Sequence, residues 1–71
     1  MNALHPKKLL RSKWTAVTPR NRQKHFIVTK VLSDDLGLPQ SCVLEAVYTH
    51  EETTLDWRSL RDSATWKIGW Q

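Results

Sequence analysis

A single cysteine, Cys42, limits what can hold this chain of 71 residues together. A chain of this length allows one domain, and it buries only about 60% of the surface that its unfolded form exposes, so its core is thin. Many domains of this size add disulfides or a metal ion. One cysteine permits no internal disulfide, and no cysteine and histidine residues have the spacing of a zinc site. The core must therefore come from large apolar side chains.

Four tryptophans supply much of that apolar mass: Trp14, Trp57, Trp66 and Trp70. Each aromatic ring buries on the order of 150–250 Å², so two or three buried indoles make up much of a core this small. Trp57 and Trp66 have apolar neighbours in sequence and are expected to pack inside. Trp70 is the tryptophan expected to remain partly exposed.

β-Branched and aromatic residues predict an antiparallel sheet of three to four strands in the middle of the chain. The expected strands cover 12–18, 25–33, 42–49 and 53–57. Strands that follow one another are expected to pair, because the connections are short. The connections are a strongly basic loop at 19–24, a turn at 34–39 and a short turn at 50–52. Gly37 supplies a positive φ in the second of these.

The strand expected at 42–49 has one apolar face. Cys42, Leu44, Ala46 and Tyr48 alternate with residues that include Glu45. Successive side chains of a strand lie on opposite faces, and the charge of Glu45 interrupts the second face. The sequence therefore predicts that Cys42, Leu44, Ala46 and Tyr48 face the core.

Short helices are expected at both ends of the chain. Residues 1–11 form an arm or one helical turn that Pro6 begins, and Leu9 and Leu10 are expected to dock on the domain. Asp62 suits the N-cap of a helix over 63–68, with Gly69 just past its end and Trp70 folded back on Trp66.

The predicted fold class is mainly β (α+β). Residues 1–71 form a single domain, with the arm at 1–11, an antiparallel β meander at 12–58 and a short helical C-terminus at 59–71. A sheet of this size and twist either stays open or closes partly into a small SH3-like barrel, and the sequence leaves both alternatives open.

The charges of the chain are separated along its length. Residues 1–33 carry eight lysines and arginines and no acid, or +8, and residues 34–71 carry seven acids against three bases, or −4, which together give the net charge of +4. Such a field attracts nucleic acid, an anionic membrane or an acidic protein to the basic half. Membrane binding is disfavoured, because the single Leu-Leu pair of the first eleven residues buries too little apolar surface for stable anchoring.

Seven cations of the basic half are candidate phosphate ligands: Lys7, Lys8, Arg11, Lys13, Arg20, Arg22 and Lys24. Cations spaced along a groove neutralise phosphates and release counterions. Trp14 and His25 are candidate stacking groups, since an exposed ring can stack on an unpaired base. The alternative for Trp14 is a place in the core, which is favoured in a chain with so little apolar mass.

No residue set predicts catalysis, a cofactor or a metal. His5, His25 and His50 are scattered without metal-ligand spacing. Gly37 and Gly69 are isolated and form no phosphate-binding loop. Cys42 is expected to be a small buried hydrophobe rather than a nucleophile, and 71 residues leave little room for a substrate cleft. The expected protein is not an enzyme.

The lone cysteine and the absence of an apolar segment after the first lysines predict a cytoplasmic protein. No window of the sequence approaches the ~18 apolar residues of a membrane-spanning helix.

Several segments resemble a family of small bacterial tryptophan-rich proteins, a domain of unassigned function. They are Pro6-Lys7-Lys8-Leu9-Leu10, Ser12-Lys13-Trp14-Thr15-Ala16-Val17, Lys24-His25-Phe26, Val43-Leu44-Glu45-Ala46-Val47-Tyr48, Trp57-Arg58-x-Leu60 and Trp66-x-x-Gly69-Trp70. The resemblance covers nearly the whole chain and implies a bacterial, cytoplasmic, single-domain protein. It carries over no binding or catalytic residue. Ser63 departs from the pattern, in which a proline commonly follows the aspartate at the start of the C-terminal helix.

Two functions of different classes fit these observations. The first is nucleic-acid binding, with RNA favoured over duplex DNA because duplex readers usually present a recognition helix. The second is a protein-interaction module, in which the basic half docks an acidic partner and a strand edge or Trp70 makes the apolar contact. The same charge separation could drive self-association, although a monomer is slightly favoured.

Overall fold

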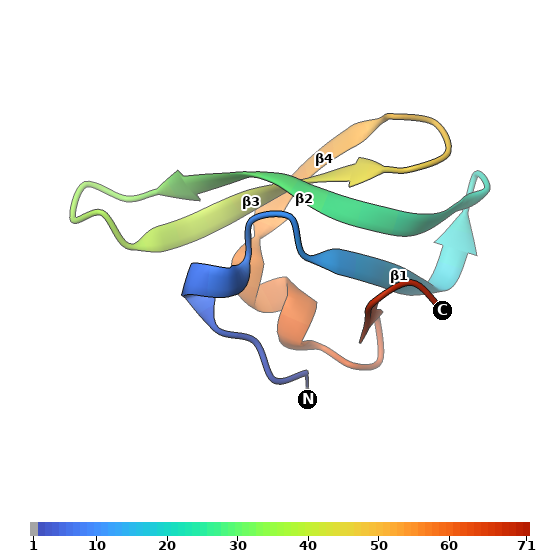
Figure 1. Ribbon diagram of the computed structural model, residues 1–71, viewed down its shortest axis with the longest axis horizontal. Helices are drawn as coiled ribbons and strands as arrows, with labels where there is room; N and C mark the ends of the chain where they lie inside the picture. The colour runs from blue at the N-terminus through green and yellow to red at the C-terminus, as the bar shows by residue number, and fades with distance from the viewer. Residues whose placement is uncertain (1) are drawn as a thin grey trace.

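The computed structural model describes residues 2–71, which form one five-stranded antiparallel sheet with two short 3₁₀ helices against one face (Figure 1). The strands are β1 (Lys13–Arg20), β2 (Gln23–Ser33), β3 (Pro39–Ala46), β4 (Glu52–Asp56) and β5 (Trp66–Ile68). Their order in the sheet is β4-β3-β2-β1-β5, so β4 and β5 are edges and the sheet is open. The predicted mainly β class and the pairing of successive strands are confirmed, and the SH3-like barrel is not.

The predicted loop at 19–24 is wrong, because the hairpin between β1 and β2 is tighter. Only Asn21 and Arg22 connect the two strands, and both have positive φ, 53° and 62°. A two-residue turn of this kind matches the right-handed twist of the strands that it joins. The basic residues on either side of this turn therefore lie on strands, which define the face of the sheet to which each side chain belongs.

Pro19 lies inside β1 rather than ending it. β5 pairs with β1 only at Trp14–Ala16, and the register between β1 and β2 shifts between Thr15 and Arg20. A proline cannot donate to a ladder, so it is confined to such unpaired or irregular stretches.

The turn predicted at 34–39 is confirmed, except that Pro39 is already the first residue of β3. The Asp34 carboxylate accepts hydrogen bonds from the main-chain N–H groups of Leu36 at 2.8 Å and Leu38 at 3.0 Å. Gly37 has the expected positive φ of 79°. The sequence Asp-Asp-Leu-Gly-Leu therefore builds a turn held by its own first side chain.

β3 ends at Ala46, three residues before its predicted end. The His50 N–H donates to the Ala46 carbonyl at 2.8 Å, and His50 has a φ of 64°. This turn takes Tyr48 out of the strand, where it is 69% exposed. The predicted core position of Tyr48 is wrong, while those of Cys42, Leu44 and Ala46 are confirmed.

The helix predicted over 63–68 is also wrong. The Asp62 carboxylate accepts from the Ala64 N–H at 3.0 Å, as a cap would, but the chain makes one turn and then enters β5. Trp66 pairs with Ala16 across β1. Six isolated helical residues are marginal in water, whereas pairing with the free edge of β1 satisfies main-chain groups of both segments.

The core lies between the sheet and the helices η1 (Pro6–Lys8) and η2 (Trp57–Arg61). Its buried apolar residues are Leu9, Trp14, Phe26, Val28, Cys42, Leu44, Ala46, Trp57 and Leu60. The predicted helical turn at Pro6 and the docking of Leu9 are confirmed, but Leu10 is exposed.

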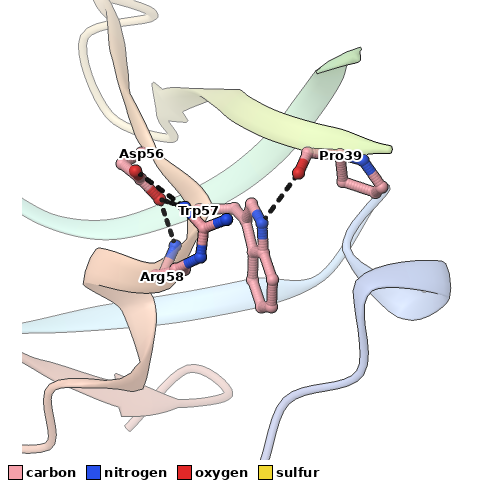
Figure 2. A network of polar contacts seen from close by, with 4 residues as sticks. All are labelled: Pro39, Asp56, Trp57 and Arg58. Carbon is pink, nitrogen blue, oxygen red and sulfur yellow. Dashed lines mark hydrogen bonds and ion pairs between the residues drawn. The ribbon is translucent and has the colours of Figure 1, made fainter. Parts of the chain in front are cut away.

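Trp57 fixes η2 against the sheet (Figure 2). Its Nε1–H donates to the Pro39 carbonyl at 3.0 Å, so the buried indole keeps a hydrogen bond. Asp56 caps the helix by accepting from the Arg58 N–H at 2.9 Å, and its carboxylate also pairs with the Arg58 guanidinium at 3.1 Å. The opposite face of the sheet is not covered by these two helices.

None of the helices within residues 2–71 has the length and apolar character needed to cross a membrane.

Candidate nucleic-acid interface

Trp70 lies across the face of the sheet that is opposite the core. Lys13 and His25 alternate with the buried Trp14 and Phe26, so their side chains lie on that far face. The Trp70 ring centroid is 6.0 Å from that of His25, and the Lys13 Nζ is 4.7 Å from the Trp70 centroid. The indole remains 45% exposed.

A short network holds Trp70 in this position. Its Nε1–H donates to the Phe26 carbonyl at 3.0 Å. The Thr15 hydroxyl donates to the Gly69 carbonyl at 2.7 Å and accepts from the Gln71 N–H at 2.9 Å. Gly69 has a positive φ of 80°, which turns the chain away from the line of β5. The exposed ring is therefore fixed by residues at both sides of it in the chain.

A groove of about 320 Å³ lies beside Lys13, and we call it the basic groove. Lys8, Arg11 and Lys13 are its cations, and Leu4 and Ile68 are among its apolar lining residues. No aspartate or glutamate is among the described residues that line it. The structure thus gathers three of the predicted phosphate ligands in one groove, and one of them, Lys13, lies over Trp70.

A second groove, of about 490 Å³, lies beside His25. It is lined by Arg22, Lys24, His25, Val47 and Tyr48. We call the whole surface the aromatic–basic strip: the basic groove, then Trp70 and His25, then this second groove. Contacts link the parts in that order, because Lys13 lies over Trp70 and Trp70 lies beside His25.

Two acids limit the strip on the side of β3 and β4. Glu45 pairs with Ile27 in the ladder, and its carboxylate lies 2.9 Å from the His50 Nδ1. The Gln23 amide donates to the Glu51 carboxylate at the end of the hairpin. A polyanion would therefore be attracted along β1 and β2 and repelled from the β3–β4 side.

Three predicted site residues do not serve the strip as ligands. Trp14 borders the basic groove, but it is 1% exposed, so its indole cannot stack on a base, and this candidate role is corrected. Lys7 is exposed on η1. Arg20 lines a different groove, of about 430 Å³, with Phe26 and Trp66. The strip keeps Lys8, Arg11, Lys13, Arg22, Lys24 and His25.

Two residues of the strip were not predicted as ligands of a nucleic acid. Alternation predicts a core position for Tyr48. The sequence predicts that Trp70 remains partly exposed, as it does, but in contact with Trp66. The signal for Trp70 was already present, because Gly69 allows the chain to turn sharply just before it. For Tyr48 the positive φ of His50 ends the strand early, and a histidine gives little indication of that conformation.

Among residues 2–71, no three histidine, cysteine, aspartate or glutamate side chains come together as ligands for a metal ion.

Comparison with known families agrees with the tryptophan pattern. A family model described as Tryptophan-rich protein (DUF2389) matches residues 12–71. The chain belongs to this family. The matched segment includes all five strands, η2 and the four tryptophans of this chain. It leaves out η1. No curated protein and no solved structure matches the chain.

Cys42 of this tryptophan-rich protein is buried in the core at β3. Burial, and second the nearby negative charge of Asp56, raise the pKa of its thiol from 9.0 to about 11. Below pH 9 the thiol is protonated in both the folded and the unfolded chain. Between pH 9 and 11 the unfolded chain loses the proton first, so the stability of the fold decreases as pH rises.

We therefore expect unfolding free energy to decrease by up to roughly 2–3 kcal/mol across this interval because of Cys42. Urea unfolding at several pH values measures it, and Cys42→Ala is the control because tyrosine and lysine titrate in the same range. Between pH 9 and 11 the unfolding free energy of Cys42→Ala should decrease by roughly 2–3 kcal/mol less than that of the wild type. Equal pH profiles for the two proteins would contradict the assignment.

Proposed function

We propose that this chain is a non-catalytic, cytoplasmic protein that binds single-stranded nucleic acid, RNA in particular, through the aromatic–basic strip. Trp70 carries the proposal. Its indole is partly exposed, is held by a hydrogen bond to Phe26, and lies beside Lys13 of the basic groove and His25 of the second groove. A partly exposed indole in that position provides a platform for one base, and the cations on either side suit the phosphates before and after it.

The energies of such a contact are adequate for weak to moderate binding. Stacking of a base on an aromatic side chain contributes about 1–3 kcal/mol. Lys13 lies over the same ring, but an exposed cation–π contact is worth only about 0.5–1 kcal/mol. Lys13 can therefore leave the ring for a phosphate at small cost when a base arrives.

Single-stranded RNA suits this surface better than duplex DNA does. Duplex readers usually insert a helix into the major groove, and the longest helix within residues 2–71 is η2, with five residues. Exposed aromatics on a small sheet are a common means of binding unpaired bases. Tyr48 offers a second ring, 69% exposed, in the groove next to His25.

Salt should weaken binding steeply. If about four of the strip's cations contact phosphates, raising salt from about 50 to about 200 mM lowers the affinity for a single strand on the order of 50-fold. Fluorescence anisotropy with a labelled mixed-sequence RNA measures this. Charge reversal by Arg22→Glu should weaken binding and reduce the salt dependence. Lys30→Glu is the matched control, because Lys30 lies on β2, which begins directly after Arg22, but roughly 20 Å along the strand from Lys24 of the strip.

No binding at low salt would overturn the proposal. Equal losses from Arg22→Glu and Lys30→Glu would also contradict it, because the effect would then follow net charge alone and not the strip.

A further inference from the structure

The hairpin between β2 and β3 ends in exposed leucines. Leu36 is 83% exposed and Leu38 is 59% exposed, and both lie next to Asp34 and Asp35. We call residues 34–38 the leucine tip. In Figure 1 this hairpin extends away from the body of the protein, at the end of the sheet opposite the β1–β2 turn. Large apolar side chains presented together at such a place indicate a contact surface.

The leucine tip is ordered before it meets any partner. The Asp34 carboxylate holds the main-chain N–H groups of Leu36 and Leu38, and the Gly37 N–H donates to the Asp34 carbonyl at 3.0 Å. A loop already fixed in one conformation loses little entropy on binding. Within the described part of the chain, the Asp35 carboxylate has no hydrogen bond or ion pair and is free to meet a cation.

The basic groove has the complementary chemistry. Its Lys8, Arg11 and Lys13 are opposite in charge to the two aspartates of the leucine tip, and Leu4 and Ile68 supply apolar lining for the leucines of the tip. Ile68 is itself half exposed. We infer that the leucine tip of one copy docks into the basic groove of a second copy.

The contact is head to tail, because the leucine tip and the basic groove are different surfaces. Each pair of copies leaves one tip and one groove open, so assembly continues as a chain or closes as a ring. One turn in one groove buries less surface than a standard protein interface, so the association is weak. Charge complementarity of this kind makes it sensitive to salt.

The docking also regulates nucleic-acid binding, and this step of the inference rests on the proposed function. Lys8, Arg11 and Lys13 belong to both the basic groove and the aromatic–basic strip. A leucine tip in the groove covers cations that phosphates would otherwise contact. Single-stranded RNA and self-association should therefore exclude each other.

Sedimentation equilibrium of the protein alone tests the docking without any assumption about RNA. At low salt the average mass should rise with protein concentration, and at about 1 M salt, where screening acts within about 3 Å, it should return to the monomer. Asp35→Lys should weaken association at least about tenfold, since it places like charges together. Glu52→Lys on β4 makes the same charge change at an exposed strand residue outside the tip and should have little effect.

Mixing two charge-reversed variants identifies the partners. Asp35→Lys alone and Lys8→Glu alone should each be monomeric. Their mixture should associate, because the unchanged tip of the Lys8→Glu protein meets the unchanged groove of the Asp35→Lys protein. Leu36→Ser should weaken assembly without altering charge.

A monomer at every concentration in low salt would overturn the inference, as would association that survives both Asp35→Lys and Leu36→Ser. A mixture that stays monomeric would overturn the head-to-tail arrangement. Adding a mixed-sequence RNA to the assembled protein should return it to single copies. If the assembly persists although anisotropy shows RNA binding, RNA and the leucine tip do not compete for the basic groove. If RNA does not bind at all, the proposed function fails while the docking stands.

Discussion

Replacing Trp14 by alanine should unfold a large share of the protein at room temperature. The indole is 1% exposed at the centre of the core, and its Nε1–H donates to the Ser12 hydroxyl at 2.8 Å. Truncation of a buried aromatic residue costs about 3–5 kcal/mol. At about 0.05–0.15 kcal/mol per residue, a chain of this length has only about 4–11 kcal/mol in total.

Urea unfolding followed by circular dichroism measures this loss. Trp70→Ala is the matched control, because it removes the same side chain from a half-exposed position and should cost much less. Trp14→Phe should fall between the two, since it keeps part of the buried ring. Equal destabilisation by Trp14→Ala and Trp70→Ala would contradict the division of the tryptophans into core and surface.

Trp70→Ala should instead act on nucleic-acid binding. Loss of a stacking platform worth about 1–3 kcal/mol lowers affinity about 5- to 150-fold. The variant also loses the Nε1 hydrogen bond to Phe26, so Trp70→Phe separates the two effects. Phenylalanine keeps an aromatic ring without the N–H, and it should retain most of the affinity if stacking is the main contribution.

Anisotropy titrations of the wild type and both variants at one salt concentration make this comparison, and circular dichroism of each variant checks the fold. Unchanged affinity in Trp70→Ala would remove the central element of the strip. A loss as large in Trp70→Phe as in Trp70→Ala would assign the effect to the position of the C-terminal segment rather than to stacking.

The sheet was largely predictable because its signals are local. The strands β2 and β3 contain short runs of β-branched and apolar residues, 26–29 and 42–44, and the turn between them contains its own cap, Asp34, and its own glycine. The faces of Cys42, Leu44 and Ala46 followed from alternation alone. Such features need no information about distant parts of the chain.

The error at the C-terminus arose because a distant segment decides the outcome. Asp62 gives a valid cap signal, but the free edge of β1, about fifty residues earlier, takes the following residues into β5.

Pro19 and its charged neighbours suggest a loop, whereas a positive φ at Arg22 closes a two-residue turn. Arginine seldom adopts this conformation, so the sequence gives little warning of it.

The candidate site was predictable in its cations, in His25 and in the partial exposure of Trp70, but not in the exposure of Tyr48 or in where Trp70 lies. The cations were found because the sign of a residue does not depend on the fold. Which indole is exposed depends on register: Trp14 pairs with Phe26 on the core side, while Gly69 and Thr15 bring Trp70 to the other face. The favoured core position of Trp14 and the predicted partial exposure of Trp70 both agree with the structure, whereas the predicted contact of Trp70 with Trp66 is replaced by one with His25.

The most direct test of the proposed strip is a titration of the isotope-labelled protein with a short mixed-sequence single-stranded RNA at low salt, followed by NMR. The side-chain indole N–H signals distinguish the four tryptophans. The Trp70 indole and the amides of Lys13, His25 and Tyr48 should shift together, while the buried indoles of Trp14 and Trp57 should stay in place. Signals that do not move with RNA in excess, or shifts confined to residues outside the strip, would contradict nucleic-acid binding at this surface.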